Sequence, residues 1–258
     1  TNQKYDPFPE EMNRRLVGCL SDLHFAPTNE HLGNLLRENF PRSNIYVTGN
    51  TVVDAVLAVA AARRGFVDRR IASIDFTGRR LVLVTAHRRE NIGEPLRDIC
   101  RAVRDMLRDF PDTVVVMPVH PNPRVQNIVF PELSGVDRCY LVDPVSYPDM
   151  VGLMQECFMV MTDSGGLQEE APALGRPVLV LRRTTERPEG LRAGTLKLVG
   201  VSREGIRREA GILLSNTEKY RQMAESPNPY GDGRACRRIV SGILHHFGLA
   251  DGRPADFA

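Results

Sequence analysis

The residues best suited to chemistry follow an apolar run past the middle of the chain. Cys157 to Met161 predicts a buried strand that ends at Thr162-Asp163, and Ser164-Gly165-Gly166 then turns the chain into a helix that reaches Leu174. Such a turn gathers backbone N–H groups that lack intrahelical partners beside the positive end of the helix. Phosphate oxygens bind well at such a point, so the pattern predicts a phosphate site.

Charged side chains on both sides of this turn extend the prediction to a nucleotide diphosphate. Glu169 and Glu170 fall in the first turns of the helix, where a carboxylate can reach the two hydroxyls of a ribose. Arg182, Arg183 and Arg187 follow the next strand and can neutralise phosphate. The alternative is an ordinary glycine-rich turn whose glutamate pair compensates the helix dipole. The arginine-rich loop favours the phosphate site.

Two histidines follow other predicted strands. His87 comes directly after the strand expected at residues 80–86, and His120 comes after the one expected at 113–119. A histidine at a strand end can bind a phosphate or transfer a proton near neutral pH. The alternatives are a structural or capping role for His87 and, for His120, a structural role in a loop that is flanked by prolines. Because ligands of parallel sheets bind at the carboxyl ends of strands, both histidines and residues 163–166 are expected to line one crevice.

Continuous runs of valine and leucine alternate with amphipathic helices over residues 43–225. This alternation predicts an α/β fold with a doubly wound parallel Rossmann-like sheet that is buried on both faces. We predict three parts in the chain: a segment over residues 1–42, this domain over 43–225, and a turn-rich linker with a C-terminal helix over 226–258. The expected strands span residues 44–48, 80–86, 113–119, 140–142, 157–161, 177–181 and 195–199.

Composition excludes several classes of function. With 42% hydrophobic and 26% charged residues, the chain is typical of soluble globular proteins. Its net charge of +2 gives no electrostatic reason to expect nucleic acid or a membrane surface as a partner. The 5 cysteines are scattered and lack metal-ligand spacing, so we expect reduced thiols in a cytoplasmic protein and no metal site.

Eight motifs together resemble those of the non-hydrolysing bacterial UDP-N-acetylglucosamine 2-epimerases, from Tyr5 to about Arg238. They are PFPEEMNR, HFAPT, VTGNTVVDA, TAHRREN, PVHPNP, the block from DSGGLQEEAP to TTERPE, AGTLKLVG and NPYGDG. The resemblance implies the B-type glycosyltransferase architecture, in which two Rossmann-like domains hold UDP in the cleft between them. This chain would form the C-terminal half of that architecture and would lack most of the N-terminal domain, since no G-T-R-P-E, H-G-D-T or E-A-G-L-R motif occurs in it.

The resemblance also implies roles for single residues. Glu10 in PFPEE matches a catalytic carboxylate, and His87 matches a histidine near the diphosphate and sugar that is expected in both catalysis and UDP binding. Glu170 would hold the ribose, and Arg187 the phosphate or sugar side. The diphosphate itself would be held by Ser164, Gly165 and Gly166.

The implied reaction converts UDP-N-acetylglucosamine to UDP-N-acetylmannosamine. UDP is eliminated across C1–C2 to give a glycal and then adds back with the C2 configuration inverted, which requires no cofactor. The expected partners are UDP-N-acetylglucosamine, UDP and a second copy of the chain, and the expected role is in cell-envelope polysaccharide biosynthesis.

Because these N-terminal motifs are missing, we expect the chain to be a catalytically incomplete fragment that can still bind UDP. Its strand near His24 is expected to lack sheet neighbours, and residues 1–42 are expected to associate or fray. Three other functions remain as alternatives: a hydrolysing epimerase, the donor domain of a B-type glycosyltransferase, and a non-catalytic UDP-sugar-binding module.

Overall fold

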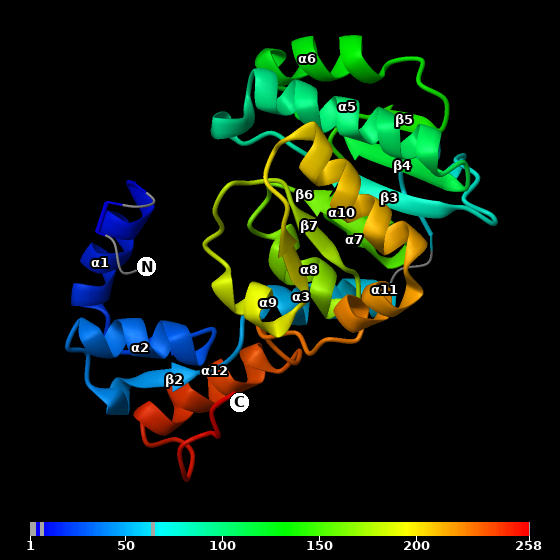
Figure 1. Cartoon of the computed structure of the whole chain (residues 1–258). Helices are drawn as coiled ribbons and strands as arrows, with labels where there is room; N and C mark the ends of the chain where they lie inside the picture. Colours follow the sequence, from blue (N-terminus) through cyan, green and yellow to red (C-terminus); the bar gives the residue numbers. More distant parts are fainter. Residues whose placement is uncertain (1–3, 6–7, 63–64, 258) are drawn as a thin grey trace. The chain divides into compact units, whose positions relative to one another are not determined.

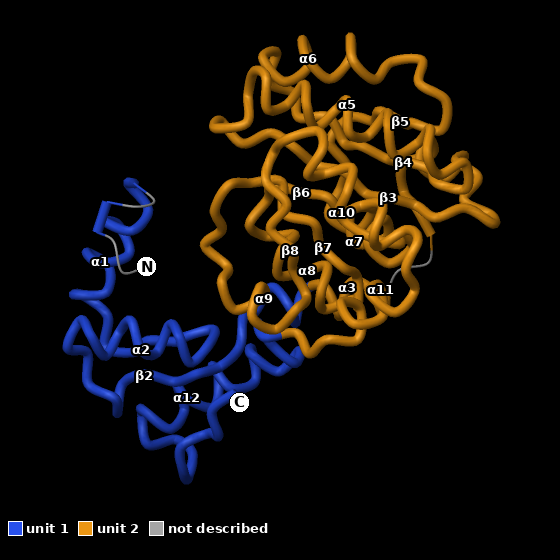
Figure 2. The backbone as a smooth tube through the Cα atoms, in the orientation of Figure 1, with its two compact units in different colours: residues 1–55, 229–258 blue, residues 56–228 orange. Residues whose placement is uncertain are grey.

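The computed structural model describes residues 4–5, 8–62 and 65–257 (Figure 1). These residues form two compact units (Figure 2). The smaller unit comprises Thr1–Ala55 and Pro229–Ala258, and the larger comprises Val56–Asn228. The units divide near residues 55 and 228, whereas the three parts inferred from the sequence divide at 42 and 225; that domain assignment stays a prediction.

A six-stranded parallel sheet forms the centre of the larger unit, which confirms the predicted α/β fold. The strand order is β5-β4-β3-β6-β7-β8, so the order reverses between β3 and β6. In such sheets the crevice beside the reversal, at the carboxyl ends of the strands, is where ligands bind. The strands are β3 (Arg80–Thr85), β4 (Thr113–Pro118), β5 (Cys139–Val142), β6 (Met159–Thr162), β7 (Val178–Val180) and β8 (Leu196–Leu198).

Both faces of this sheet are buried under helices. Side chains alternate along β3, so Val82 and Val84 belong to one core cluster whereas Leu81 and Leu83 belong to another. This explains why the strand sequences are apolar at every position rather than at every second one. The first cluster includes residues of α5 (Glu94–Asp109), α6 (Pro123–Leu133) and α10 (Arg203–Ser215), and the second includes residues of α7 (Tyr147–Glu156) and α8 (Leu167–Ala173).

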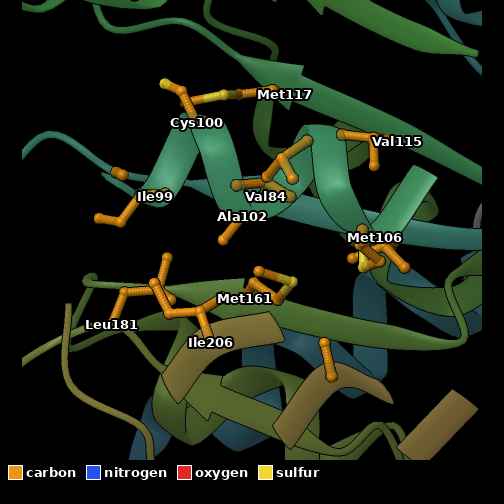
Figure 3. Packing of buried hydrophobic residues seen from close by; sticks show 14 of the residues in the cluster. Val84, Ile99, Cys100, Ala102, Met106, Val115, Met117, Met161, Leu181 and Ile206 are labelled. Carbon is orange, nitrogen blue, oxygen red and sulfur yellow. The ribbon is translucent and has the colours of Figure 1, made fainter. Parts of the chain in front are cut away.

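Figure 3 shows the first cluster from close by. Ile99 and Met106 of α5 lie over the strand residues Val84 and Met161, and Ile206 of α10 belongs to the same cluster. This packing fixes the two strands that flank the reversal of strand order.

Three further helical segments belong to the larger unit. The connection at 65–78 contains α4 (Arg69–Ala72), which forms because Asp68 caps it and Ile71 is fully buried. α6 extends to Leu133, which is fully buried. α9 (Pro188–Ala193) starts at a proline and ends at Gly194, which has a φ of 85°. α11 (Thr217–Ala224) and a 3-10 turn at Arg89–Asn91 complete the larger unit.

The smaller unit contains a second sheet, in which β1 (His24–Ala26) pairs in parallel with β2 (Ile45–Val47). The expectation that the strand at His24 lacks a sheet neighbour is therefore wrong. α2 (Asn29–Arg37) carries the chain back so that β2 runs beside β1, and Leu35 of this helix packs with Ala26 and Ile45. The unit also holds α1 (Glu10–Leu20), a 3-10 turn at Arg42–Asn44, and α12 (Ala235–His246), and it shares α3 (Thr51–Ala62) with the larger unit.

Candidate functional site

The carboxyl ends of β3 and β6 are tied together by side chains and backbone. The hydroxyl oxygens of Thr85 and Thr162 lie 2.6 Å apart, and the N–H of Asp163 donates to the carbonyl of Thr85 over 3.2 Å. The loops that leave these two strands therefore start side by side, at the point where the strand order reverses. His87 and Ser164 lie on these two loops.

Asp163 organises the loop after β3, although the sequence analysis assigned it no role. Its side chain is fully buried. One carboxylate oxygen, Oδ2, accepts the backbone N–H groups of His87 and Arg88 over 2.9 and 2.8 Å. The same oxygen accepts Nδ2 of Asn91 over 3.0 Å, and that amide also donates to the carbonyl of Leu181. The carboxylate thus fixes the conformation of the histidine segment.

His87 lies partly exposed between an acid and a second imidazole. Its Nδ1 is 3.7 Å from Oδ1 of Asp163, and its ring stacks on that of His120 with centroids 5.0 Å apart. Burial lowers the pKa of His87 below 6.5, and the positive charge of a protonated His120 or of Arg88 acts in the same direction, against the opposing effect of Asp163. At neutral pH His87 is therefore an uncharged imidazole.

Two guanidinium groups face the bare Cα of Gly165. A Cβ built on this glycine would lie 3.4 Å from Nη2 of Arg88 and 3.8 Å from Nη2 of Arg187. Nε of Arg88 donates to the carbonyl of Asp163 over 3.2 Å, which holds that side chain beside the turn. The space over Gly165 therefore suits an anion. Arg88 was not among the predicted site residues, and its place directly after His87 is the signal that could have found it.

Arg187 also carries a carboxylate partner within this site. Its Nε donates to Oε1 of Glu169, a buried residue of α8. Burial raises the pKa of Glu169, and the Arg187 cation opposes that rise. The loop before Arg187 is tied to α8 as well, since the hydroxyl of Thr185 donates to Gln168 over 2.6 Å and accepts the N–H of Arg187 over 3.1 Å. These contacts hold the arginine at the turn.

The other two arginines of this loop lie differently from the expectation of a phosphate contact. Arg182 is buried and donates to Glu90 over 2.9 Å and to both oxygens of Glu186 over 2.6 and 3.0 Å. Arg183 is exposed. We therefore assign Arg182 to holding the loop in place, because its donors are taken by carboxylates.

Glu170, the predicted ribose contact, accepts a hydrogen bond from a tyrosine that the sequence analysis did not single out. The hydroxyl of Tyr147, at the start of α7, donates to Oε1 of Glu170 over 2.9 Å. Burial raises the pKa of Glu170, and this hydrogen bond lowers it in part. Burial and the same bond raise the pKa of Tyr147 to about 12, so its proton stays in place at neutral pH.

The structure gathers six of the seven predicted site residues in the larger unit and places Glu10 in the smaller one, exposed at the start of α1. Among the six, Ser164 is held by its N–H, which donates to Oγ1 of Thr162 over 2.9 Å. No cluster of histidine, cysteine and carboxylate side chains suited to a metal occurs among the described residues. Nor does any described helix combine the length and apolar character needed to cross a membrane.

Comparison with known proteins points to one family. The family model for UDP-N-acetylglucosamine 2-epimerase matches residues 1–244. A Thermotoga maritima relative is 55% identical over 251 residues, which make up 97% of this chain and 66% of that protein. The UDP-N-acetylglucosamine 2-epimerase of Bacillus subtilis is 46% identical over 258 residues, all of this chain and 67% of that protein.

A solved structure agrees with the sequence comparison. The UDP-GlcNAc 2-epimerase of Neisseria meningitidis, whose structure was determined bound to UDP-GlcNAc, superposes with a TM-score of 0.86 at 41% identity. The match covers 95% of this chain and 67% of that one. The chain thus spans about two thirds of the length of the relatives it matches. It belongs to the UDP-N-acetylglucosamine 2-epimerase family.

Proposed function

We propose that this protein takes part in the 2-epimerisation of UDP-N-acetylglucosamine and that its larger unit holds the UDP group. The observation that carries the proposal is the convergence of Arg88 and Arg187 on the bare Cα of Gly165, beside the reversal of strand order. Two guanidinium groups over a glycine attract a phosphate group and leave room for it. The Neisseria meningitidis relative bound to UDP-GlcNAc supports the identity of the ligand.

In the proposed reaction, the bond between C1 of the sugar and the UDP oxygen breaks while C2 loses its proton. Arg88, Arg187 and the backbone N–H groups of Gly165 and Gly166 would stabilise the negative charge that develops on the departing UDP. The glycal then takes back UDP at C1 and a proton at C2 with the opposite configuration. Because the site holds UDP throughout the reaction, UDP can add back to the glycal.

Four further roles belong to the same proposal. Ser164 would bind the diphosphate beside the glycines, and Glu170 would bind the ribose hydroxyls. His87 would lie next to the diphosphate and sugar as an uncharged imidazole. Glu10 would transfer a proton at the sugar; its support is the match of PFPEE to the family motif.

Calorimetry on the 258-residue chain tests the binding part of the proposal. UDP should bind more tightly than UMP, and uridine should bind most weakly, because each phosphate removed loses contacts with the arginines and the turn. Uridine that binds as tightly as UDP would contradict the site.

Proton NMR of UDP-N-acetylglucosamine incubated with the same sample tests the reaction. UDP-N-acetylmannosamine is the expected product of the epimerase. Free N-acetylmannosamine with UDP would indicate a hydrolysing enzyme, and turnover only with an added acceptor would indicate a glycosyltransferase. Binding without turnover would leave these 258 residues with the UDP-binding function alone.

The family resemblance also leads us to propose a cytoplasmic homo-oligomer, with a dimer as the expected form, that supplies sugar for cell-envelope polysaccharide. Sedimentation equilibrium tests the association, and a species of 28.8 kDa at every concentration would contradict it.

A further inference from the structure

The two oxygens of the Asp163 carboxylate have unequal surroundings. Oδ2 accepts three N–H groups, from the backbone of His87 and Arg88 and from the side chain of Asn91. Oδ1 is buried and accepts no hydrogen bond from any residue that the structure describes. A buried acceptor without a donor lowers the stability of the folded protein, so an N–H group that donates to Oδ1 would be stabilising.

Nδ1 of His87 is the ring nitrogen that the structure places beside this oxygen, at 3.7 Å. The distance exceeds that of a hydrogen bond, so the imidazole must rotate toward Oδ1 to form one. Catalytic hydrogen bonds are often long before a ligand is bound. His87 follows the end of β3 and Asp163 follows the end of β6, the two strands that flank the reversal of strand order.

The neighbouring imidazole is held in its own tautomer. Nδ1 of His120 accepts the backbone N–H of Asn122 over 3.1 Å, so a neutral His120 carries its proton on Nε2. Its ring stacks nearly parallel to that of His87, at an interplanar angle of 12°. Asp163, His120 and Arg88 are the charged or titratable groups that act on His87. Asp163 alone among them offers an acceptor for the Nδ1 proton.

We propose that Asp163 is a positioning residue for His87. It holds the neutral imidazole as the Nδ1–H tautomer and leaves Nε2, on the opposite edge of the ring, to accept a hydrogen bond or a proton from the ligand. The identity of that ligand rests on the proposed function, whereas the tautomer is a property of the ligand-free protein. A histidine that transfers a proton requires one ring nitrogen that keeps its proton and another that is free to accept one.

The test is nitrogen NMR of the ligand-free protein labelled with ¹⁵N-histidine, at a pH above the imidazole titration. The set of imidazole signals that is missing from the His87→Gln spectrum, compared with that of the unmodified protein, is assigned to His87. Long-range proton–nitrogen correlations then show which ring nitrogen carries the proton, and Nδ1 is the expected one. Neutral His87 protonated at Nε2 in the unmodified protein would overturn the proposal without any variant at Asp163.

Asp163→Asn should invert the tautomer. The amide oxygen would take the place of Oδ2, because three N–H groups face that position, and the amide NH₂ would then face Nδ1 of His87. A donor at this place requires an unprotonated Nδ1, so the proton should move to Nε2. A folded Asp163→Asn protein that keeps the proton on Nδ1 would contradict the positioning role.

Asp149→Asn is the matched control. Asp149 is also a buried aspartate, and it accepts the backbone N–H groups of Val67 and Asp68 over 2.7 and 3.1 Å. The exchange removes the same charge, and the His87 tautomer should not change.

A UDP titration of each labelled sample tests the proposed function separately from the tautomer. An Nδ1–H tautomer without UDP binding would contradict the proposed function and leave the positioning role intact.

Discussion

The guanidinium of Arg88 lies so close to the Cα of Gly165 that a methyl group on this carbon would stand 3.4 Å from Nη2. The glycine is not required by its backbone, because its φ lies outside the left-handed region. The absence of a side chain is therefore a matter of space. That space, between Arg88 and Arg187, is where we place a phosphate group of UDP.

Gly165→Ala should weaken UDP binding and leave the fold intact. The methyl group would compete with the phosphate for the space under the two guanidinium groups, and overpacking of about 1–3 kcal/mol corresponds to a loss of roughly fivefold to a hundredfold. Calorimetry measures the affinity, and thermal unfolding checks the fold. Gly211→Ala is the control: this helix residue has only ordinary contacts with Phe110, at 3.8 Å. Equal UDP affinity in both variants would rule out a phosphate at this place.

Arg187→Ala should reduce UDP affinity by about tenfold to a hundredfold, since a hydrogen bond to a charged group contributes about 1.5–3 kcal/mol. The exchange also removes an ion-pair partner of the buried Glu169. The double variant Glu169→Gln/Arg187→Ala therefore separates the effects: it should regain stability but not affinity. Arg207→Ala, which breaks a surface ion pair with Asp109, is the control for lost charge. Recovery of affinity in the double variant would show that Arg187 acts only through Glu169.

Tyr147→Phe and Glu170→Gln should weaken UDP but leave inorganic pyrophosphate unchanged. The tyrosine hydroxyl holds Glu170, and a neutral or misdirected side chain is a poorer acceptor for the ribose hydroxyls. Competition calorimetry with the two ligands gives the comparison. Tyr140→Phe, on β5, should affect neither. Equal losses for both ligands would show that the pair acts on the phosphates or on the fold.

His87 should titrate below pH 6.5, its ordinary value. Between the lowered pKa and 6.5 the unfolded chain binds more protons at this residue than the folded one, so its contribution to stability rises with pH and is lost as the pH falls. NMR titration of the ring protons gives the midpoint. Urea unfolding over the same pH range should show a weaker rise with pH in His87→Gln. A midpoint above 6.5 would contradict the lowered pKa.

Arg182→Met should destabilise the protein by about 3 kcal/mol, because it leaves the carboxylate of Glu186 without its buried cation. Arg183→Met, at the exposed neighbouring position, should change stability little. Urea unfolding measures both. If Arg182→Met instead left stability unchanged and removed UDP binding, Arg182 would be a phosphate ligand.

Much of the larger unit follows from the sequence. A strand buried on both faces must be apolar at every position, and LVLV at 81–84 has this pattern, so the parallel sheet could be predicted. The turn Ser164-Gly165-Gly166 could be proposed as a phosphate site because the groups involved are neighbours along the chain, and that role stays a prediction. The motifs also identified the family correctly.

The tertiary structure decided which side chains meet. Asp163 and His87 are separated by 76 positions along the chain, and Tyr147 and Glu170 by 23, so no local pattern marks either pair. Arg182 and Arg187 lie on the same loop, yet one is buried between carboxylates and the other faces the glycine turn. Periodicity in a sequence reports burial. The partner of a charged group depends on competition among donors and acceptors within a few ångströms, and only the folded chain sets those distances.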